Sequence, residues 1–250
     1  MAKATDKKSI NKLARRLRQA HETGKPCKPV RKDLPEHDLD AAYAVQDANT
    51  QHWIKQGRRL IGRKIGLTSA VVQDQLGVDQ PDFGMLFADM AILDGAEIQG
   101  SAVLQPRIEG EISFVLGDDL DMEMATVADV TSAIAYAVAS IEVVGSRIEN
   151  WDINIVDTIA DNASSGLFVL GNEPHAIEDF DTRLCGMVVE HRGEPVSVGA
   201  GAACLGNPLN AVTWLAREMV LRGRPLLAGD VVMSGALGPM VSVTPGGVYE

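Results

Sequence analysis

The most informative segment of the chain is Pro106-Arg107-Ile108-Glu109-Gly110-Glu111-Ile112-Ser113-Phe114-Val115-Leu116. Alternate side chains of a β-strand share a face, so the apolar residues Ile108, Ile112, Phe114 and Leu116 lie on one face and Glu109, Glu111 and Ser113 on the other. Two carboxylates about 7 Å apart along one strand repel each other unless a cation or a proton lies between them. The segment therefore predicts either a metal site or an exposed strand face that carries two glutamates.

A third carboxylate lies in the apolar run Ala139-Ser140-Ile141-Glu142-Val143-Val144-Gly145. An acidic side chain in such a run needs a partner, which Arg147 or Arg107 would supply as an ion pair. The other possibility is a cation that Glu142 shares with Glu109 and Glu111. Oxygen-only ligands suit Mg²⁺, Mn²⁺ or Ca²⁺, and three of them leave about three octahedral positions for water or a chelating substrate.

Three further segments carry polar groups next to apolar ones. Gly62-Arg63-Lys64-Ile65-Gly66-Leu67-Thr68-Ser69 places a lysine just before a predicted helix, where it can bind a carboxylate or move a proton, or can be an exposed loop lysine. Gln80-Pro81-Asp82-Phe83-Gly84 is typical of a turn, in which Asp82 can act only as a turn former. The polar segment 157–166, with Asn162 and Ser164, is explained largely by helix capping and loop roles.

Helix and strand patterns predict an α+β fold. Apolar spacing predicts helices over 9–22, 39–56, 68–76, 127–139 and 208–223. Strands are predicted over 108–116, 167–170, 187–198 (folded around 192–193), 231–233 and 240–243. Helices dominate early and strands late, without regular β-α alternation, so we expect a helical N-terminal region (1–65) and a β-rich body (66–250) that form one continuous unit.

Composition excludes several classes of function. The chain has 250 residues, with 23 Lys+Arg against 34 Asp+Glu and a net charge of −11, which disfavours binding to nucleic acid or to a membrane surface. The three cysteines are far apart, and no apolar run approaches about 18 residues, so a cytoplasmic protein without disulfides is expected. Dinucleotide, P-loop, G-x-S-x-G and H-E-x-x-H motifs are absent.

In combination, these segments resemble those of the 2-keto-4-pentenoate hydratases, also called 2-hydroxypentadienoate hydratases, of the fumarylacetoacetate-hydrolase-like superfamily. The resemblance covers essentially the whole chain in the same order and includes Leu76–Gly84, Leu104–Glu111, Glu142–Ile148, Val156–Ser164 and Gly235–Met240. It implies a rolled, β-rich mixed sheet with Mg²⁺ or Mn²⁺ on the positions of Glu109, Glu111 and Glu142. Lys64 and Asp82 match catalytic positions, and Arg63, Asn162 and Ser164 match or adjoin positions that contact the substrate.

The implied reaction is the addition of water to a 2-hydroxy-2,4-dienoate, which gives a 4-hydroxy-2-oxoalkanoate in the meta-cleavage degradation of aromatic or steroid compounds. The resemblance further implies a homo-oligomer, of five or ten subunits, and a possible complex with a downstream aldolase or decarboxylase. It also implies another strand after Glu250, so the chain looks shortened at its C-terminus. The substituent on the dienoate and the native metal stay open.

Three other functions share part of this pattern. A 4-oxalocrotonate decarboxylase would share the metal site and the chelated substrate but release CO₂. Hydrolysis of an acylpyruvate would need a histidine and an acid that activate water, and no histidine is obviously placed for it. A non-catalytic partner subunit would not need Lys64, Asp82 and all three glutamates.

Overall fold

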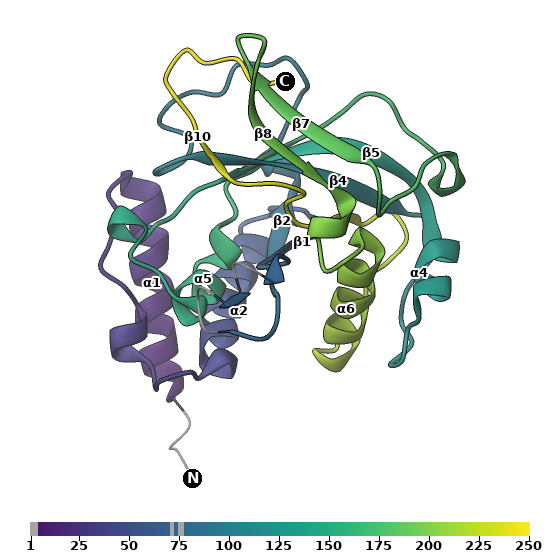
Figure 1. Ribbon diagram of the computed structural model, residues 1–250. Coiled ribbons are helices and arrows are strands. Elements are labelled where there is room, and N and C mark those ends of the chain that lie inside the picture. Colours follow the sequence, from purple (N-terminus) through teal and green to yellow (C-terminus); the bar gives the residue numbers. More distant parts are fainter. Residues whose placement is uncertain (1–4, 71–72, 75–77) are drawn as a thin grey trace.

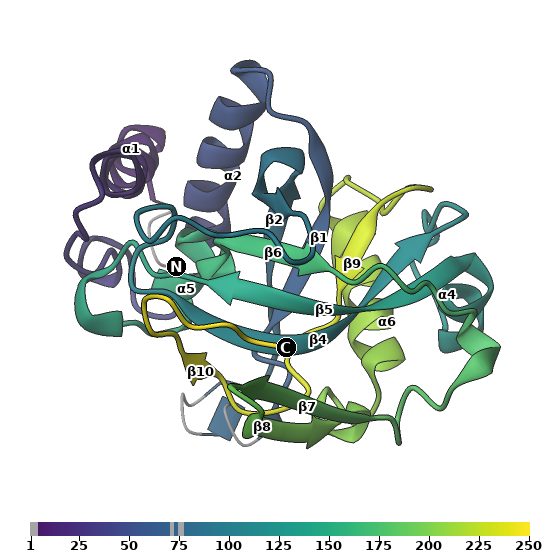
Figure 2. The same ribbon diagram turned by 90° about the horizontal axis from the view of Figure 1, so that it is seen from above.

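The computed structural model describes residues 5–70, 73–74 and 78–250 and is built on one curved, eight-stranded mixed sheet. Its strand order is β2-β1-β9-β4-β5-β6-β3, with β10 paired to β4, and β7 and β8 form a separate hairpin. Figure 2 shows the curvature of the sheet, with β4 and β5 running through its middle. The strands are β1 (Leu60–Gly66), β2 (Asp82–Phe87), β3 (Ala91–Ile92), β4 (Arg107–Leu116), β5 (Ile134–Val144), β6 (Leu167–Leu170), β7 (Gly186–His191), β8 (Glu194–Ala200), β9 (Val231–Met233) and β10 (Val241–Ser242).

The helices gather on one side of the sheet, below it in Figure 1. Within the described residues they are α1 (Lys7–Thr23), α2 (Leu39–Lys55), α4 (Val127–Ala133), α5 (Ile155–Ala160) and α6 (Pro208–Leu221), and several short 3₁₀ turns lie between the elements. α1 begins where the side chain of Asp6 accepts from the Ser9 amide, and it ends at Gly24 with φ 66°. None of the helices in the described ranges has the length and apolar character needed to cross a membrane.

A 3₁₀ turn, η4 (Asn162–Ser164), is hydrogen-bonded both to β2 and to the residue that follows β5. The side-chain amide of Asn162 accepts from the Met85 amide at 2.7 Å and donates to the Met85 carbonyl at 3.0 Å. On its other side, the carbonyl of Ser164 accepts from the Gly145 amide at 2.8 Å. The turn therefore draws β2 toward β5 and encloses the polar face of β4 within the roll.

Most of the predicted elements are confirmed. Helices form where 9–22, 39–56 and 208–223 were predicted, and the predicted strands and the hairpin turning at 192–193 are present. The helix expected over 68–76 falls partly outside the described residues. The predicted boundary at residue 65 falls inside β1, which pairs with both β2 and β9.

Two predictions were wrong. The helix predicted over 127–139 ends at Ala133, because from Ile134 onward the chain pairs with β4 along the whole of β5, and this pairing overrides the helical spacing. Asp82 is not in a turn. It begins β2, where it pairs with Gly66 of β1 and is fully buried.

Candidate metal centre

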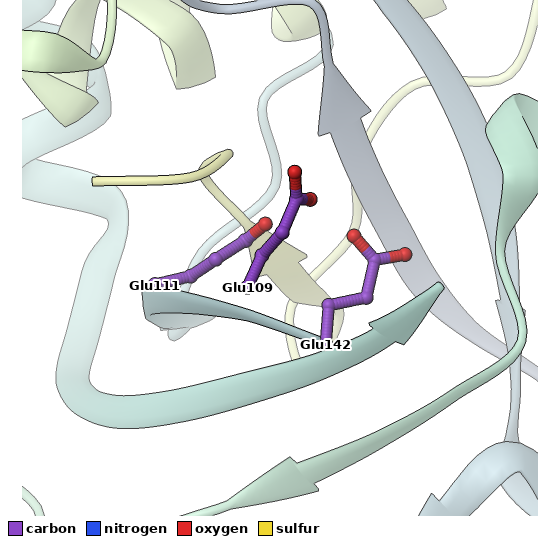
Figure 3. A group of neighbouring side chains, drawn as sticks. All are labelled: Glu109, Glu111 and Glu142. Atoms are coloured by element: carbon purple, nitrogen blue, oxygen red, sulfur yellow. The ribbon is translucent and has the colours of Figure 1, made fainter. Parts of the chain in front are cut away.

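Three glutamates meet at the centre of the sheet. Glu109 on β4 lies directly opposite Glu142 on β5, and Glu111 shares the face of Glu109 because it is two residues further along β4. Figure 3 shows the three side chains rising from the two neighbouring strands toward the same side. One carboxylate oxygen from each residue lies within 4.8 Å of those from the other two, which is the arrangement expected for ligands of one cation.

Two of the three glutamates are buried, Glu109 is partly buried, and the group is short of hydrogen-bond donors. Glu111 is 3% exposed and Glu142 is 1% exposed. Oε1 of Glu111, both carboxylate oxygens of Glu142 and both of Asp82 accept no hydrogen bond from the part of the chain that is described. Burying carboxylates that accept no hydrogen bond is costly, and a divalent cation bound by oxygen ligands reduces this cost. The residues therefore fit Mg²⁺ or Mn²⁺.

Lys64 on β1 is the cation nearest to these glutamates among the described residues. Its Nζ lies 3.2 Å from Oε2 of Glu142 and donates to the carbonyl of Ala163 at 2.8 Å. The ion pairs considered for Glu142 are not formed, because Arg147 binds Asp161 at 2.6 Å and Arg107 lies over the ring of Trp151. Lys64 is thus a buried partner of the cluster and not an exposed loop lysine.

Gly66 leaves room for the side chain of Asp82 beside Lys64. A Cβ atom on Gly66 would lie 2.2 Å from Oδ1 of Asp82 and 3.4 Å from Nζ of Lys64. Only the absence of a side chain at Gly66 therefore leaves room for the carboxyl group of Asp82 above the β1–β2 pair. The β1–β2 register thus adds a fourth carboxyl group to the site.

Burial dominates the titration of these groups. It raises the pKa of Asp82 to about 6 and that of Glu142 to about 7, although Lys64 acts against both shifts. Burial and the neighbouring charges of Glu142 and Glu109 raise the pKa of Glu111 well above its usual range. Burial acts to lower the pKa of Lys64, but the four surrounding carboxyl groups outweigh it and raise that pKa, so Lys64 is protonated at neutral pH.

These shifts predict how metal-free protein responds to pH. A carboxyl group whose pKa is raised by folding stabilises the fold below its unfolded pKa, near 4, and loses this contribution as pH rises through 6 to 7. Mg²⁺ at 100 times its Kd adds about 2.7 kcal/mol to the free energy of unfolding, which corresponds to roughly 5–10 °C in Tm. We expect the difference in Tm between samples with Mg²⁺ and with EDTA to widen from pH 5.5 to 8; a difference that stays constant would contradict these pKa shifts.

The three residues expected to contact substrate have different surroundings. Ser164 is buried beside the Lys64 acceptor Ala163, and its Oγ has no partner among the described residues. The side chain of Asn162 is occupied by the backbone of Met85, so it holds the η4 turn. Arg63 follows the alternation of β1 to the face opposite Lys64, where its Nη1 donates to the carbonyl of Gly62 and the nearest charges are Asp230 and Arg224. Ser164 thus follows the residue that Lys64 binds and has a free hydroxyl, whereas the side chains of Arg63 and Asn162 contact other groups.

The position of Arg63 leads to a prediction. Arg63→Met should leave KM and kcat close to wild type, because the side chain faces away from the glutamates, although the fold loses a buried hydrogen bond. Steady-state kinetics at saturating Mg²⁺ would check this. A large rise in KM with unchanged kcat would return Arg63 to the substrate site.

Sequence reasoning missed one contact of the cluster. The amide of Gly235 donates to Oε2 of Glu111 at 3.0 Å. A backbone donor leaves no trace in residue type, so only the tertiary structure reveals it. Ser113 and Ser140, which bond each other at 2.7 Å, share the face of the glutamates, as the alternation in β4 predicted for Ser113.

Comparison with known proteins places the chain in a family. Residues 43–250 match the fumarylacetoacetate (FAA) hydrolase C-terminal family model. The chain is 61% identical to the TodF product hydratase of Pseudomonas putida, over 97% of this chain and 90% of that protein. It is 57% identical to the 2-keto-4-pentenoate hydratase of Paraburkholderia xenovorans, over 95% of this chain and 88% of that protein. The solved structure of 4-oxalocrotonate decarboxylase from Pseudomonas putida G7, complexed with magnesium and adipate, superposes with a TM-score of 0.95 at 34% identity, over 99% of this chain and 94% of the other. The chain belongs to the fumarylacetoacetate hydrolase family.

Proposed function

We propose that the protein is a metal-dependent hydratase that adds water to a 2-hydroxy-2,4-dienoate and forms a 4-hydroxy-2-oxoalkanoate, a reaction of meta-cleavage degradation. The observation that carries the proposal is the Glu109–Glu111–Glu142 cluster with buried Lys64 and Asp82 beside it. The hydratase names of the relatives at 57–61% identity support the choice of reaction.

The reaction has two proton-transfer stages. In 2-hydroxypenta-2,4-dienoate the 2-hydroxyl loses its proton and C5 gains one, which gives a 2-oxo-3-enoate. Water then adds across C3 and C4, with the hydroxyl on C4 and the proton on C3. Glu109, Glu111 and Glu142 would hold a divalent ion, which, when bound, would supply Lewis-acid stabilisation of negative charge on the substrate oxygen at C2.

The chain's own groups have separate roles in this scheme. Protonated Lys64, which lies next to Glu142, stabilises negative charge on the substrate. Its raised pKa makes it a poor base at neutral pH. Asp82, with a pKa of about 6, is suited to accept and return a proton near pH 7. The unpartnered hydroxyl of Ser164 is available to a substrate oxygen. The net charge of −11 disfavours an anionic substrate, but salt screens the distant charges. Within the site, the nearby positive charges therefore determine the electrostatic attraction of the substrate.

The test is a direct assay. Purified protein is mixed with 2-hydroxypenta-2,4-dienoate, and the ultraviolet absorbance of the dienoate is followed with Mg²⁺, Mn²⁺ or EDTA while the product is identified by mass. A metal-dependent product heavier by one water supports the hydratase. Unchanged substrate from protein that binds Mg²⁺ would reject it.

Decarboxylation is the second candidate, since the solved structure of the decarboxylase is so similar. Release of CO₂ from 2-oxo-3-hexenedioate, measured under the same conditions, decides between the two. Turnover of the hexenedioate that exceeds hydration of the pentadienoate would replace the hydratase by a decarboxylase.

We also propose that the protein forms a homo-oligomer, of five or ten subunits. The β7–β8 hairpin exposes an apolar pair, Val188 and Val198, which lie opposite each other and are 51% and 61% exposed. Sedimentation analysis of wild type and of a Val188→Lys/Val198→Lys variant would test this: we expect a defined oligomer from the former and smaller species from the latter, and a monomeric wild type would contradict it. Association with a downstream aldolase or decarboxylase is a further possibility that co-purification tests.

A further inference from the structure

The segment after β9 runs beside β4 and contains one residue more than regular antiparallel pairing with β4 requires. The Ser234 amide donates to the Ile112 carbonyl at 3.1 Å, and the Leu237 amide donates to the Gly110 carbonyl at 3.0 Å. Three steps along this segment thus match two steps along β4, which is a β-bulge opposite Glu111. Bulges turn backbone groups out of the ladder, and they are frequent next to active sites.

Gly235 is the residue that turns. With φ 105° it takes a conformation that side-chain-bearing residues rarely adopt, and its amide donates to Oε2 of Glu111 at 3.0 Å. Oε1 of the same carboxylate accepts no hydrogen bond from the described residues. Glu142 is also contacted at one carboxylate oxygen, because Nζ of Lys64 lies 3.2 Å from its Oε2. Two of the three candidate ligands are thus held from a different element of the fold.

Close packing requires glycine at this position. A Cβ atom on Gly235 would lie 2.4 Å from Oγ1 and 3.0 Å from Cβ of Thr68. Thr68 is itself buried, and its carbonyl accepts from the Leu205 amide at 2.8 Å, so it has little freedom to withdraw. A side chain at position 235 would therefore displace the amide from Glu111.

We propose that Gly235 is a positioning residue of the metal centre: its amide, turned inward by the bulge, holds Oε2 of Glu111 and leaves Oε1 free to bind a divalent cation. Thr68 supports this arrangement by packing against the Cα of Gly235. The proposal rests on the proposed metal centre, and it adds a backbone donor that fixes the direction of one ligand. Groups that orient metal ligands in this way typically change metal affinity by about 10–100-fold when they are lost.

The experiment compares two glycines by calorimetric titration of the metal-free protein with Mg²⁺. Gly235→Ala should weaken Mg²⁺ binding about 10–100-fold. The matched control is Gly229→Ala. Gly229 also has a positive φ, 87°, but nothing lies within 4 Å of its added Cβ, and its amide donates to the carbonyl of Leu116, at the far end of β4, at 2.8 Å. We expect both variants to melt below wild type and only Gly235→Ala to lose affinity.

A second measurement needs no substitution at Gly235. In wild-type protein labelled with ¹⁵N-glycine, the amide resonance of Gly235 should shift on addition of Mg²⁺, whereas that of Gly229 should not. Equal Mg²⁺ affinity in the two alanine variants, or a Gly235 resonance that does not respond to Mg²⁺, would overturn the positioning role while leaving the metal centre intact. Absence of Mg²⁺ binding to wild type would instead reject the metal centre itself.

Discussion

Glu109→Gln should reduce kcat/KM by at least about a thousandfold, or about 4 kcal/mol of transition-state stabilisation. Glutamine has nearly the same shape as glutamate, so the variant removes one negative ligand and little else. Glu109 lies directly opposite Glu142, and its loss leaves two carboxylates for the cation. Mg²⁺ affinity, measured by calorimetry, should fall together with activity.

The same substitution should have the opposite effect on metal-free protein. In EDTA, Glu109 repels Asp82, Glu111 and Glu142, as its contributions to their raised pKa values show. Removing that charge relieves the repulsion, so Glu109→Gln should melt above wild type in EDTA and below it in saturating Mg²⁺. The control, Glu123→Gln on an exposed loop, should change neither Tm nor activity. A Glu109→Gln variant that melts below wild type in both solutions would indicate a structural role for Glu109.

The three glutamates of the candidate metal centre could be singled out from the sequence because their signal is local. Alternation along β4 placed Glu109 and Glu111 on one face, and an acid within an apolar run singled out Glu142. The strand that carries Glu142 was predicted only in part, because the spacing of Val127, Val130, Ile134 and Ala137 suits a helix until pairing with β4 intervenes. Local pattern therefore identified the residues better than the element that carries one of them.

The rest of the site depends on contacts between distant segments. Asp82 reaches Lys64 only through the register of β1 with β2, and its sequence context suggested a turn. Arg63 adjoins Lys64 in sequence, yet strand alternation turns it to the opposite face. The Gly235 amide has no side chain to reveal it. Such residues can be assigned only when the strand order of the sheet is known.

Lys64→Met should lower kcat by about 10²–10⁴ while Mg²⁺ still binds. Methionine keeps much of the length and apolar character of the lysine stem but removes the cation that lies 3.2 Å from Glu142 and donates to Ala163. Because that cation repels Mg²⁺, its loss should leave metal affinity unchanged or increased. Glu109→Gln and Lys64→Met therefore both abolish efficient turnover, but only Glu109→Gln weakens Mg²⁺ binding.

The stability of the Lys64→Met variant should depend strongly on metal. Without metal at pH 8, removing one partner of a buried ion pair costs about 3–5 kcal/mol, because the carboxylate of Glu142 is left unpaired. Saturating Mg²⁺ should recover part of this loss, since the ion replaces the missing positive charge. Arg63→Met, one residue away on the opposite face of β1, is the matched control and should retain activity. If Lys64→Met also lost Mg²⁺ binding, Lys64 would act chiefly by orienting Glu142, and its assignment to the stabilisation of negative charge on the substrate would have to be withdrawn.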